Sequence, residues 1–239
     1  MSVSSKKEFA CCGCNACAEI CPKHCIKMVA DRKGFLYPKV DTAVCIECGI
    51  CEKICPFEKD NICLNPSIKA FAAWNKERKQ YLQSSSGGAA YVFASYIIGI
   101  GGVVYGCTAE GLDIRHIRID SQTNVYKLQG SKYVQSNVCN LYSQIKNDLK
   151  TGTPVLFIGT PCQVAGLKNY IRHVSEHLYL IDLICHGVPS LKMLKEHVQH
   201  IAGTKSIERI SFRKGSDFRL NLQGKEFYYV RSVWKDMYY

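Results

Sequence analysis

The sequence lacks an uninterrupted apolar run long enough to cross a membrane. Its one long stretch without a charged residue extends from Leu82 to Ala109, but Gly99, Gly101 and Gly102 interrupt it. A membrane-spanning helix needs about 20 consecutive apolar residues. We therefore expect no membrane span here, and predict a buried helix followed by a buried strand.

The amino terminus also lacks the charged, apolar and small-residue pattern of a secretion signal. The 239 residues nevertheless include 15 cysteines. A secreted disulfide scaffold is not the expected explanation, because eight of these cysteines are clustered at metal-ligand spacing. The sequence therefore predicts a metal-binding protein of the reducing cytoplasm.

Acidic residues are fewer than basic ones, 20 against 31, which gives a formal net charge of +11. The basic residues form no run of five or more and no stripe interleaved with aromatic residues. Nucleic acid is therefore not an expected partner. A solvated basic surface is the favoured interpretation, and the alternative is a surface that attracts anionic cofactors or acidic redox partners.

One cysteine pattern, C-x2-C-x2-C-x3-C-P, occurs twice, beginning at Cys11 and at Cys45. A loop with three cysteines at this spacing wraps one corner of a cubane cluster, and in two-cluster ferredoxins the fourth ligand comes from the other motif. The predicted ligand sets are Cys11, Cys14, Cys17 and Cys55 for one [4Fe-4S] cluster, and Cys45, Cys48, Cys51 and Cys21 for the other. Zinc is the alternative, but it usually binds separated C-x2-C pairs.

Five further cysteines fall outside this spacing, and we expect them to be small buried residues. They are Cys12, Cys25, Cys63, Cys107 and Cys139.

The apolar pattern predicts two successive modules. Ile26–Val29 and Phe35–Val40 are expected to form a hairpin of an α+β ferredoxin-like module at 1–65, with a linker at Asn61–Ser67. Residues 66–239 are expected to form an α/β domain with a mixed, mostly covered sheet. Its predicted strands span 69–74, 103–107, 114–119, 155–158, 178–184 and 207–212, and its predicted helices span 87–98, 134–150, 163–171 and 191–201.

Two polar loops precede predicted helices. In Ser84–Gly88 the serine hydroxyls are expected to cap the helix, while the glycines and the helix dipole favour an anion. The alternative is a capped helix that binds nothing. Gly130–Tyr133 adds Lys132, which can contact a phosphate or a flavin carbonyl, or can simply be solvated.

Two cysteines follow predicted strands. Cys162 lies in the first turn of a helix, where the dipole lowers the pKa of a thiol. Cys185 and His186 are adjacent at a strand end and point to opposite faces, so they are a poor nucleophile and base pair. Cys162 and Cys185 can instead contribute to one cluster.

These loops and the cysteine repeat resemble the family of coenzyme F420 hydrogenase/dehydrogenase beta subunits, with a fused amino-terminal two-[4Fe-4S] ferredoxin domain. The motifs are SSSGG at 84–88, GSKYVQS at 130–136, GTPCQVAGLK at 159–168 and DLICHGVPS at 182–190. The resemblance implies an iron–sulfur flavoprotein oxidoreductase. Its clusters would exchange electrons with FAD, and FAD would exchange a hydride with F420 or another organic substrate. A redox partner protein or ferredoxin is also implied.

The resemblance carries over to individual residues. Those that match its flavin-side loops are Ser86, Gly87, Gly88, Gly130, Ser131 and Lys132. Cys162 and Cys185 match ligands of a third [4Fe-4S] cluster, and Lys132 and His186 are the candidate catalytic groups near the flavin ring.

Two features depart from the family pattern. The family's downstream C-x2-C pair does not occur before Tyr239, and Ser216 follows Gly215 where relatives commonly have tryptophan. We therefore expect a chain that is short at its carboxyl terminus, in which the third cluster is doubtful. The alternative function is a non-enzymatic ferredoxin-type electron carrier whose α/β part only docks a partner.

Overall fold

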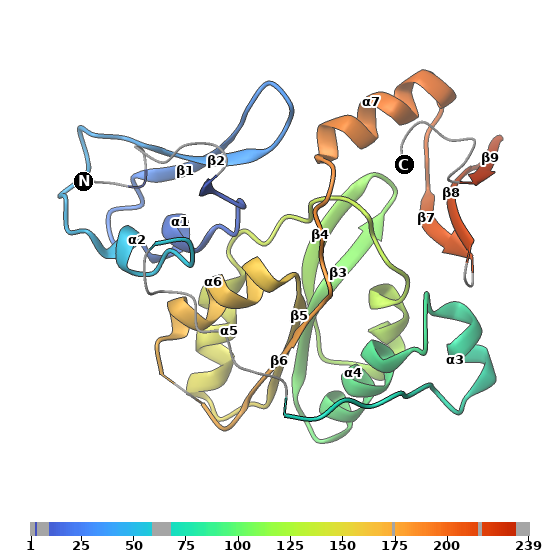
Figure 1. Cartoon of the computed structure of the whole chain (residues 1–239), viewed down its shortest axis with the longest axis horizontal. Coiled ribbons are helices and arrows are strands. Elements are labelled where there is room, and N and C mark those ends of the chain that lie inside the picture. Colours follow the sequence, from blue (N-terminus) through green and yellow to red (C-terminus); the bar gives the residue numbers. More distant parts are fainter. Residues whose placement is uncertain (1–2, 4–9, 59–67, 174, 215–216, 233–239) are drawn as a thin grey trace. The chain divides into compact units, whose positions relative to one another are not determined.

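The computed structural model describes residues 3, 10–58, 68–173, 175–214 and 217–232 (Figure 1). The chain forms a mixed α/β fold with several sheets, divided into two compact units. The first unit combines Met1–Ile68 with Val138–Cys185, and the second combines Lys69–Asn137 with His186–Tyr239. Each unit is thus built from two separate stretches of chain. The predicted linker at 61–67, Cys63 and the pair at 215–216 lie outside the described residues.

The amino-terminal part of the first unit contains two short helices and a hairpin (Figure 1). They are α1 (Ala16–Ile20), β1 (Ile26–Ala30), β2 (Leu36–Val40) and α2 (Ile50–Lys53). β1 and β2 pair antiparallel, with Ile26 opposite Val40. Asp31 Oδ1 closes the turn by accepting hydrogen bonds from the backbone N–H groups of Lys33 and Phe35 at 2.9 and 2.8 Å. The predicted hairpin is confirmed.

The rest of the first unit is a parallel strand pair with its helices (Figure 1). The elements are α5 (Leu141–Lys150), β5 (Val155–Gly159), α6 (Pro161–Ile171) and β6 (Leu178–Asp182). Every residue of β5 is buried, as its unbroken apolar sequence predicts. α6 connects β5 to β6, because parallel strands require a crossover. The predicted strands and helix in this region are confirmed within a few residues.

The second unit contains the remaining elements. They are α3 (Arg78–Gln83), α4 (Ala89–Gly99), β3 (Val103–Glu110), β4 (Asp113–Ile119), the 3-10 helix η3 (Gln122–Leu128), α7 (Leu191–Ala202), β7 (Arg209–Lys214), β8 (Asp217–Gly224) and β9 (Phe227–Ser232). β3 and β4 form an antiparallel hairpin, and β7, β8 and β9 form an antiparallel sheet.

A hydrophobic core joins α7 to this three-stranded sheet. Leu194, Val198 and Ala202 recur at helical spacing on one face of α7. Their buried partners are Ile114, Val134, Phe212, Leu220 and Leu222. Helix α7 was predicted from the same spacing, whereas β8 and β9 were not predicted.

Two of the predicted elements are wrong. Residues 69–74 form no strand in the structure, and the side chains of Phe71 and Trp74 are 84% and 70% exposed. The predicted helix from Val134 begins only at Leu141, because Asn140 adopts a left-handed conformation with φ 63° and Asn137 bridges to Arg115 of β4. In the described ranges, no helix is long and apolar enough to span a membrane.

Candidate functional site

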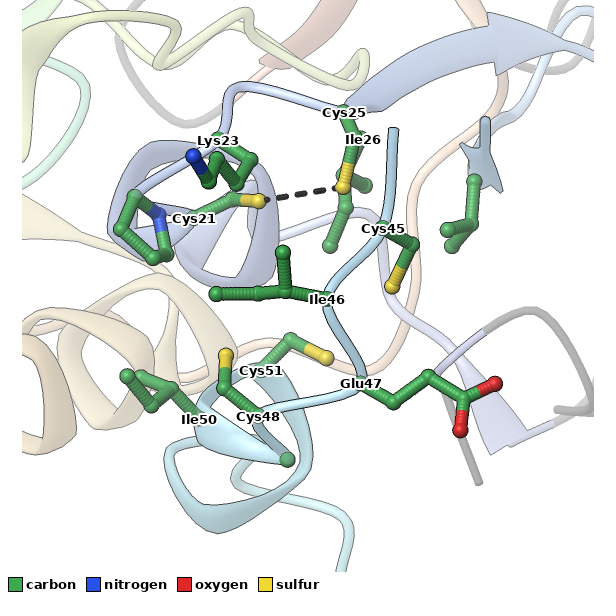
Figure 2. Close-up of a pocket in the computed structure, with 13 residues that line it drawn as sticks. Cys21, Lys23, Cys25, Ile26, Cys45, Ile46, Glu47, Cys48, Ile50 and Cys51 are labelled. Atoms are coloured by element: carbon green, nitrogen blue, oxygen red, sulfur yellow. Dashed lines mark hydrogen bonds between the residues drawn. The ribbon is translucent and has the colours of Figure 1, made fainter. Parts of the chain in front are cut away.

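A pocket in the first unit gathers cysteines from both motifs (Figure 2). We call it the Cys21 pocket, after the one ligand candidate that the first motif contributes. Its cysteines are Cys21, Cys25, Cys45, Cys48 and Cys51. Apolar side chains such as Ile26, Ile46 and Ile50 complete its wall.

A second pocket shows the reciprocal arrangement. We call it the Cys55 pocket, because Cys55 is its contribution from the second motif. Its cysteines are Cys11, Cys12, Cys14, Cys17 and Cys55. The two pockets therefore group the eight motif cysteines as the sequence predicted, and their role as ligands stays a prediction.

The cysteines in these pockets do not converge on one ion. Among the residues described by the structure, no three His, Cys, Asp or Glu side chains are arranged to hold a single metal ion. Tetrahedral zinc requires ligand atoms about 2.0–2.3 Å from one centre. A [4Fe-4S] cluster needs four thiolates around a larger metal core, and each pocket is lined by cysteines from both motifs.

The loops that carry the cysteines share one backbone pattern. Left-handed residues occur two and four positions after the first cysteine of each motif, at Gly13 and Asn15 with φ 69° and 66°. The equivalent positions in the second motif, Glu47 and Gly49, have φ 51° and 69°. Such left-handed positions build concavities of backbone N–H groups that favour anionic clusters. Glycine adopts this conformation without strain and asparagine does so more readily than other residues, so Glu47 is the position that departs from residue preference.

Hydrogen bonds lower the pKa of two of the motif thiols, and the thiolate is the form that binds metals. Burial opposes ionisation of Cys21, but its pKa is lowered by hydrogen bonds from the backbone N–H and thiol of Cys25 and from the backbone N–H groups of Lys23 and His24. The pKa of Cys14 is lowered chiefly by a hydrogen bond from Cys12. Burial raises the pKa of Cys17, and the surrounding thiols raise it further.

Helices α5 and α6 pack directly against the Cys55 pocket. The Tyr142 hydroxyl lies 2.9 Å from the backbone oxygen of Cys14 and 3.0 Å from that of Gln163. Gly166 allows α6 to lie close to Cys14, because a Cβ at this position would be 3.1 Å from Cys14 Sγ. Glu19 Oε2 also accepts a hydrogen bond from Ser143 N at the start of α5. The cysteine motif and the downstream helices thus form one packed unit.

Replacing Tyr142 by phenylalanine should destabilise the first unit by about 1–3 kcal/mol, because a buried carbonyl loses its donor. The measurement is the midpoint of anaerobic urea unfolding. Tyr179→Phe is the control, because Tyr179 is 45% exposed and should change the midpoint little. Equal midpoints for the Tyr142→Phe and Tyr179→Phe variants would contradict the assigned hydrogen bond.

Cys162 lies in the first turn of α6, as predicted, but its thiol neighbour is Cys12. A hydrogen bond from Cys12 is the main reason that the pKa of Cys162 is lowered to about 6, with Thr160 and backbone N–H groups adding to it against burial. Thr160 Oγ1 is 3.1 Å from Cys162 Sγ. Hydrogen bonds to Cys14 and Cys162, together with burial, raise the pKa of Cys12. Sequence spacing gave no signal for this contact.

The two predicted flavin-side loops meet in the second unit. Ser131 N donates a 2.7 Å hydrogen bond to Ser85 Oγ. Ser86 and Gly130 are exposed, and a Cβ at Gly130 would face open space. The predicted serine cap on α4 is wrong, because its N-cap is Gly88 and no side chain caps it. Gly130 leaves space for a bound group, whereas the Gly87 backbone oxygen accepts a 2.6 Å hydrogen bond from Asn75 N.

The Lys132 side chain folds back onto the backbone of the residues that precede it. Its Nζ donates hydrogen bonds to the backbone oxygens of Gln129 and Lys127 at 2.9 and 3.4 Å. Desolvation lowers the pKa of Lys132 to about 8, although nearby Cys107 opposes the shift. Burial raises the pKa of Cys107.

Lys132→Met should remove a pH dependence of stability. The lysine is neutral in the folded protein and protonated in the unfolded chain between about pH 8 and 10, so stability should rise with pH in this window. The difference in unfolding free energy between wild type and Lys132→Met should therefore change by on the order of 1–3 kcal/mol from pH 7.5 to pH 10. A difference that stays constant across these pH values would contradict the buried lysine.

The remaining predicted residues lie at the surface. Cys185 and His186 are exposed after β6. Cys139 is also exposed, so its prediction as a core residue is wrong: it sits in the turn before α5.

Two family models match the chain. Residues 10–59 match the 4Fe-4S dicluster domain, and residues 152–234 match the carboxyl terminus of the coenzyme F420 hydrogenase/dehydrogenase beta subunit. The first match shows that the region of the two cysteine motifs is similar to a 4Fe-4S dicluster domain, which supports iron–sulfur clusters. The second match shows that residues 152–234 are similar to the carboxyl-terminal domain of coenzyme F420 hydrogenase/dehydrogenase beta subunits, as the sequence motifs predicted.

Two known relatives also match. The chain is 24% identical over 221 residues to the F subunit of F(420)H(2) dehydrogenase from Methanosarcina mazei, a match that covers 86% of this chain and 62% of that protein. It is 33% identical over 75 residues to NADH-quinone oxidoreductase subunit I of Pelobacter propionicus, covering 28% of this chain and 39% of that protein. The chain thus spans less than two thirds of either relative.

A solved structure is similar as well. It is the F420-reducing [NiFe] hydrogenase complex from Methanosarcina barkeri, with a TM-score of 0.49 and 16% identity. The match covers 70% of this chain and 60% of that chain.

Proposed function

We propose that this chain is an electron-transfer component of an F420-linked oxidoreductase, in which two [4Fe-4S] clusters exchange electrons with FAD. The observation that carries the proposal is the pair of cysteine pockets, each completed by a cysteine from the other motif. The matches to a dicluster domain and to the F420 hydrogenase/dehydrogenase beta subunit support it.

The residues that would hold the clusters are the eight motif cysteines. When bound, the clusters supply one-electron transfer, and FAD supplies the exchange between single electrons and a hydride. The protein's part is to fix the thiols around each pocket. Left-handed residues shape both loops, and Tyr142 and Gly166 hold the Cys55 pocket against α5 and α6.

FAD is assigned to the paired loops of the second unit. The proposed contacts are Ser86, Gly87, Gly88, Gly130, Ser131 and Lys132. The hydrogen bond between Ser131 and Ser85 holds the two loops together. Lys132 would act first as a loop brace, since its amine faces backbone oxygens. His186 is the exposed polar candidate near the ring.

We propose two clusters only and include no third cluster at Cys162 and Cys185. The thiol of Cys162 interacts with Cys12, while Cys185 is exposed.

The hydride partner would be F420 or another organic donor, and the electron partner would be a ferredoxin or another redox protein. The thiols required by the clusters make the reducing cytoplasm the expected location.

Anaerobic reconstitution followed by iron, sulfide and flavin analysis tests this function. We expect about 8 irons per chain and one flavin. Bleaching of the flavin by F420H2, NADH, NADPH or reduced ferredoxin, each tried in turn, then identifies the donor. Two intact clusters without flavin would reject the flavoenzyme, and about 12 irons would reveal a third cluster.

A non-enzymatic electron carrier is the second candidate function. The observation that favours it is the similarity of 75 residues to NADH-quinone oxidoreductase subunit I. In this case the clusters would be the only redox centres and the second unit would dock a partner. The absence of bound flavin with full cluster content is its expected result.

A further inference from the structure

Cys25 lies outside the repeated ligand spacing, yet its sulfur belongs to the Cys21 pocket. The sulfurs of Cys21 and Cys25 are 3.4 Å apart, and both residues are buried. Figure 2 shows the Cys25 side chain pointing to Cys21, with Cys45 on its other side. A hydrogen bond with the Cys45 thiol is also among its interactions. Five thiols therefore line a pocket in which a [4Fe-4S] cluster uses four.

The backbone brings Cys25 to this position and keeps it there. A tight turn follows Cys21, in which His24 N donates to the Cys21 oxygen at 3.1 Å and His24 has φ 49°. Asp41 N then donates a 2.8 Å hydrogen bond to the Cys25 oxygen, which ties the residue to the end of β2. The fifth thiol is thus fixed by the fold and not by a mobile loop.

The second motif offers an internal comparison. Cys25 stands four residues after Cys21, and the residue four positions after Cys55 is Lys59. The Cys55 pocket also has a fifth thiol, Cys12, but that thiol comes from within the first motif. A thiol four residues after the crossing cysteine therefore occurs only in the Cys21 pocket. Its burial alone is explained by core packing, since Ile26 and Val3 are buried beside it. Core packing alone does not require a sulfur within 3.4 Å of a ligand sulfur.

We propose that Cys25 is an alternative ligand of the cluster in the Cys21 pocket, able to replace Cys21. The inference rests on the proposed function, because it requires that this pocket binds a [4Fe-4S] cluster. In the exchange, the Cys25 thiol releases its proton to solvent as its sulfur bonds to iron. The bond from iron to Cys21 breaks, and the Cys21 thiolate takes up a proton. No electron is gained or lost.

The test compares Cys21→Ala with Cys21→Ala/Cys25→Ala in the full chain, reconstituted anaerobically. Iron and sulfide content, together with the EPR spectrum of the reduced protein, count the intact clusters. We expect Cys21→Ala to keep two intact clusters and about 8 irons, and the double variant to keep one. Cys25→Ala should keep both, because the four motif cysteines remain.

Cys48→Ala is the matched control in the same pocket. Cys25 lies against Cys21 and Cys45 and on the far side of the pocket from Cys48 (Figure 2). Cys48→Ala should therefore lose the intact cluster even with Cys25 present. If Cys21→Ala loses the cluster as completely as Cys21→Ala/Cys25→Ala, the proposal is overturned.

Two outcomes separate this inference from the proposed function. A wild-type chain that binds no cluster in the Cys21 pocket contradicts both. A wild-type chain with two clusters, combined with a Cys21→Ala chain with one, contradicts only the role of Cys25. Should Cys21→Ala not fold, Cys21→Val with and without Cys25→Ala makes the same comparison, because valine also lacks a sulfur and fills the buried position of Cys21 better than alanine. Loss of the cluster from both of those variants rejects the proposal.

Discussion

Alanine at Cys17 and Cys55 together should leave one intact [4Fe-4S] cluster and about four irons per chain. The reason is that both cysteines line the Cys55 pocket, although they belong to different motifs. Removing two ligands from one pocket empties it and leaves the Cys21 pocket with its full set. The measurement is the iron and sulfide content together with the EPR spectrum of the reduced protein.

The matched variant carries alanine at Cys51 and Cys55, which belong to the same motif. Cys51 lines the Cys21 pocket and Cys55 lines the other, so each pocket loses one ligand. No intact [4Fe-4S] signal should remain. If each motif instead held its own cluster, the results of the two variants would be exchanged. The pair of experiments therefore decides whether each cluster takes its fourth ligand from the other motif or from its own.

The cysteine groups were predictable because their spacing directly reflects the chemistry. Three thiols at two-residue gaps bind one corner of a cluster, and the fourth follows from the known crossing of two-cluster ferredoxins. The strand β5 and the helices α4, α6 and α7 were also predictable, because a local apolar pattern identified each. In these cases the signal lay within a dozen neighbouring residues.

Features that depend on distant parts of the chain were not predictable. Cys12 and Cys162 are 150 positions apart in the sequence, and only packing of α6 on the first motif brings them together. Residues 69–74 have the composition of a strand but remain exposed without a partner. Helix α5 begins later than predicted, at Leu141, because Asn140 adopts a left-handed conformation that cannot be part of the helix. Local preference fails in these segments because the presence or absence of tertiary contacts decides their conformation.

The second large expected effect concerns the hydrophobic core around α7. This core belongs to the second unit, whereas the cysteine pockets belong to the first. Leu194→Ala should destabilise the second unit by about 2–5 kcal/mol, because it leaves a cavity in a fully buried core. Leu194 is 0% exposed and packs in a cluster with Val198 and Phe212. The eight motif cysteines, which are the proposed cluster ligands, all belong to the first unit, so the iron content should stay unchanged.

Lys195→Ala is the control for this experiment, since Lys195 is the next residue of α7 and is exposed. Urea unfolding followed by tryptophan fluorescence reports on the second unit, because both tryptophans of the sequence, Trp74 and Trp234, belong to it. This measurement should show a lower midpoint for Leu194→Ala only. The EPR spectrum of the clusters should be the same in both variants. Loss of cluster signal in Leu194→Ala but not in Lys195→Ala would mean that the first unit depends on the α7 core for its stability. In that case the two units would unfold as one cooperative body.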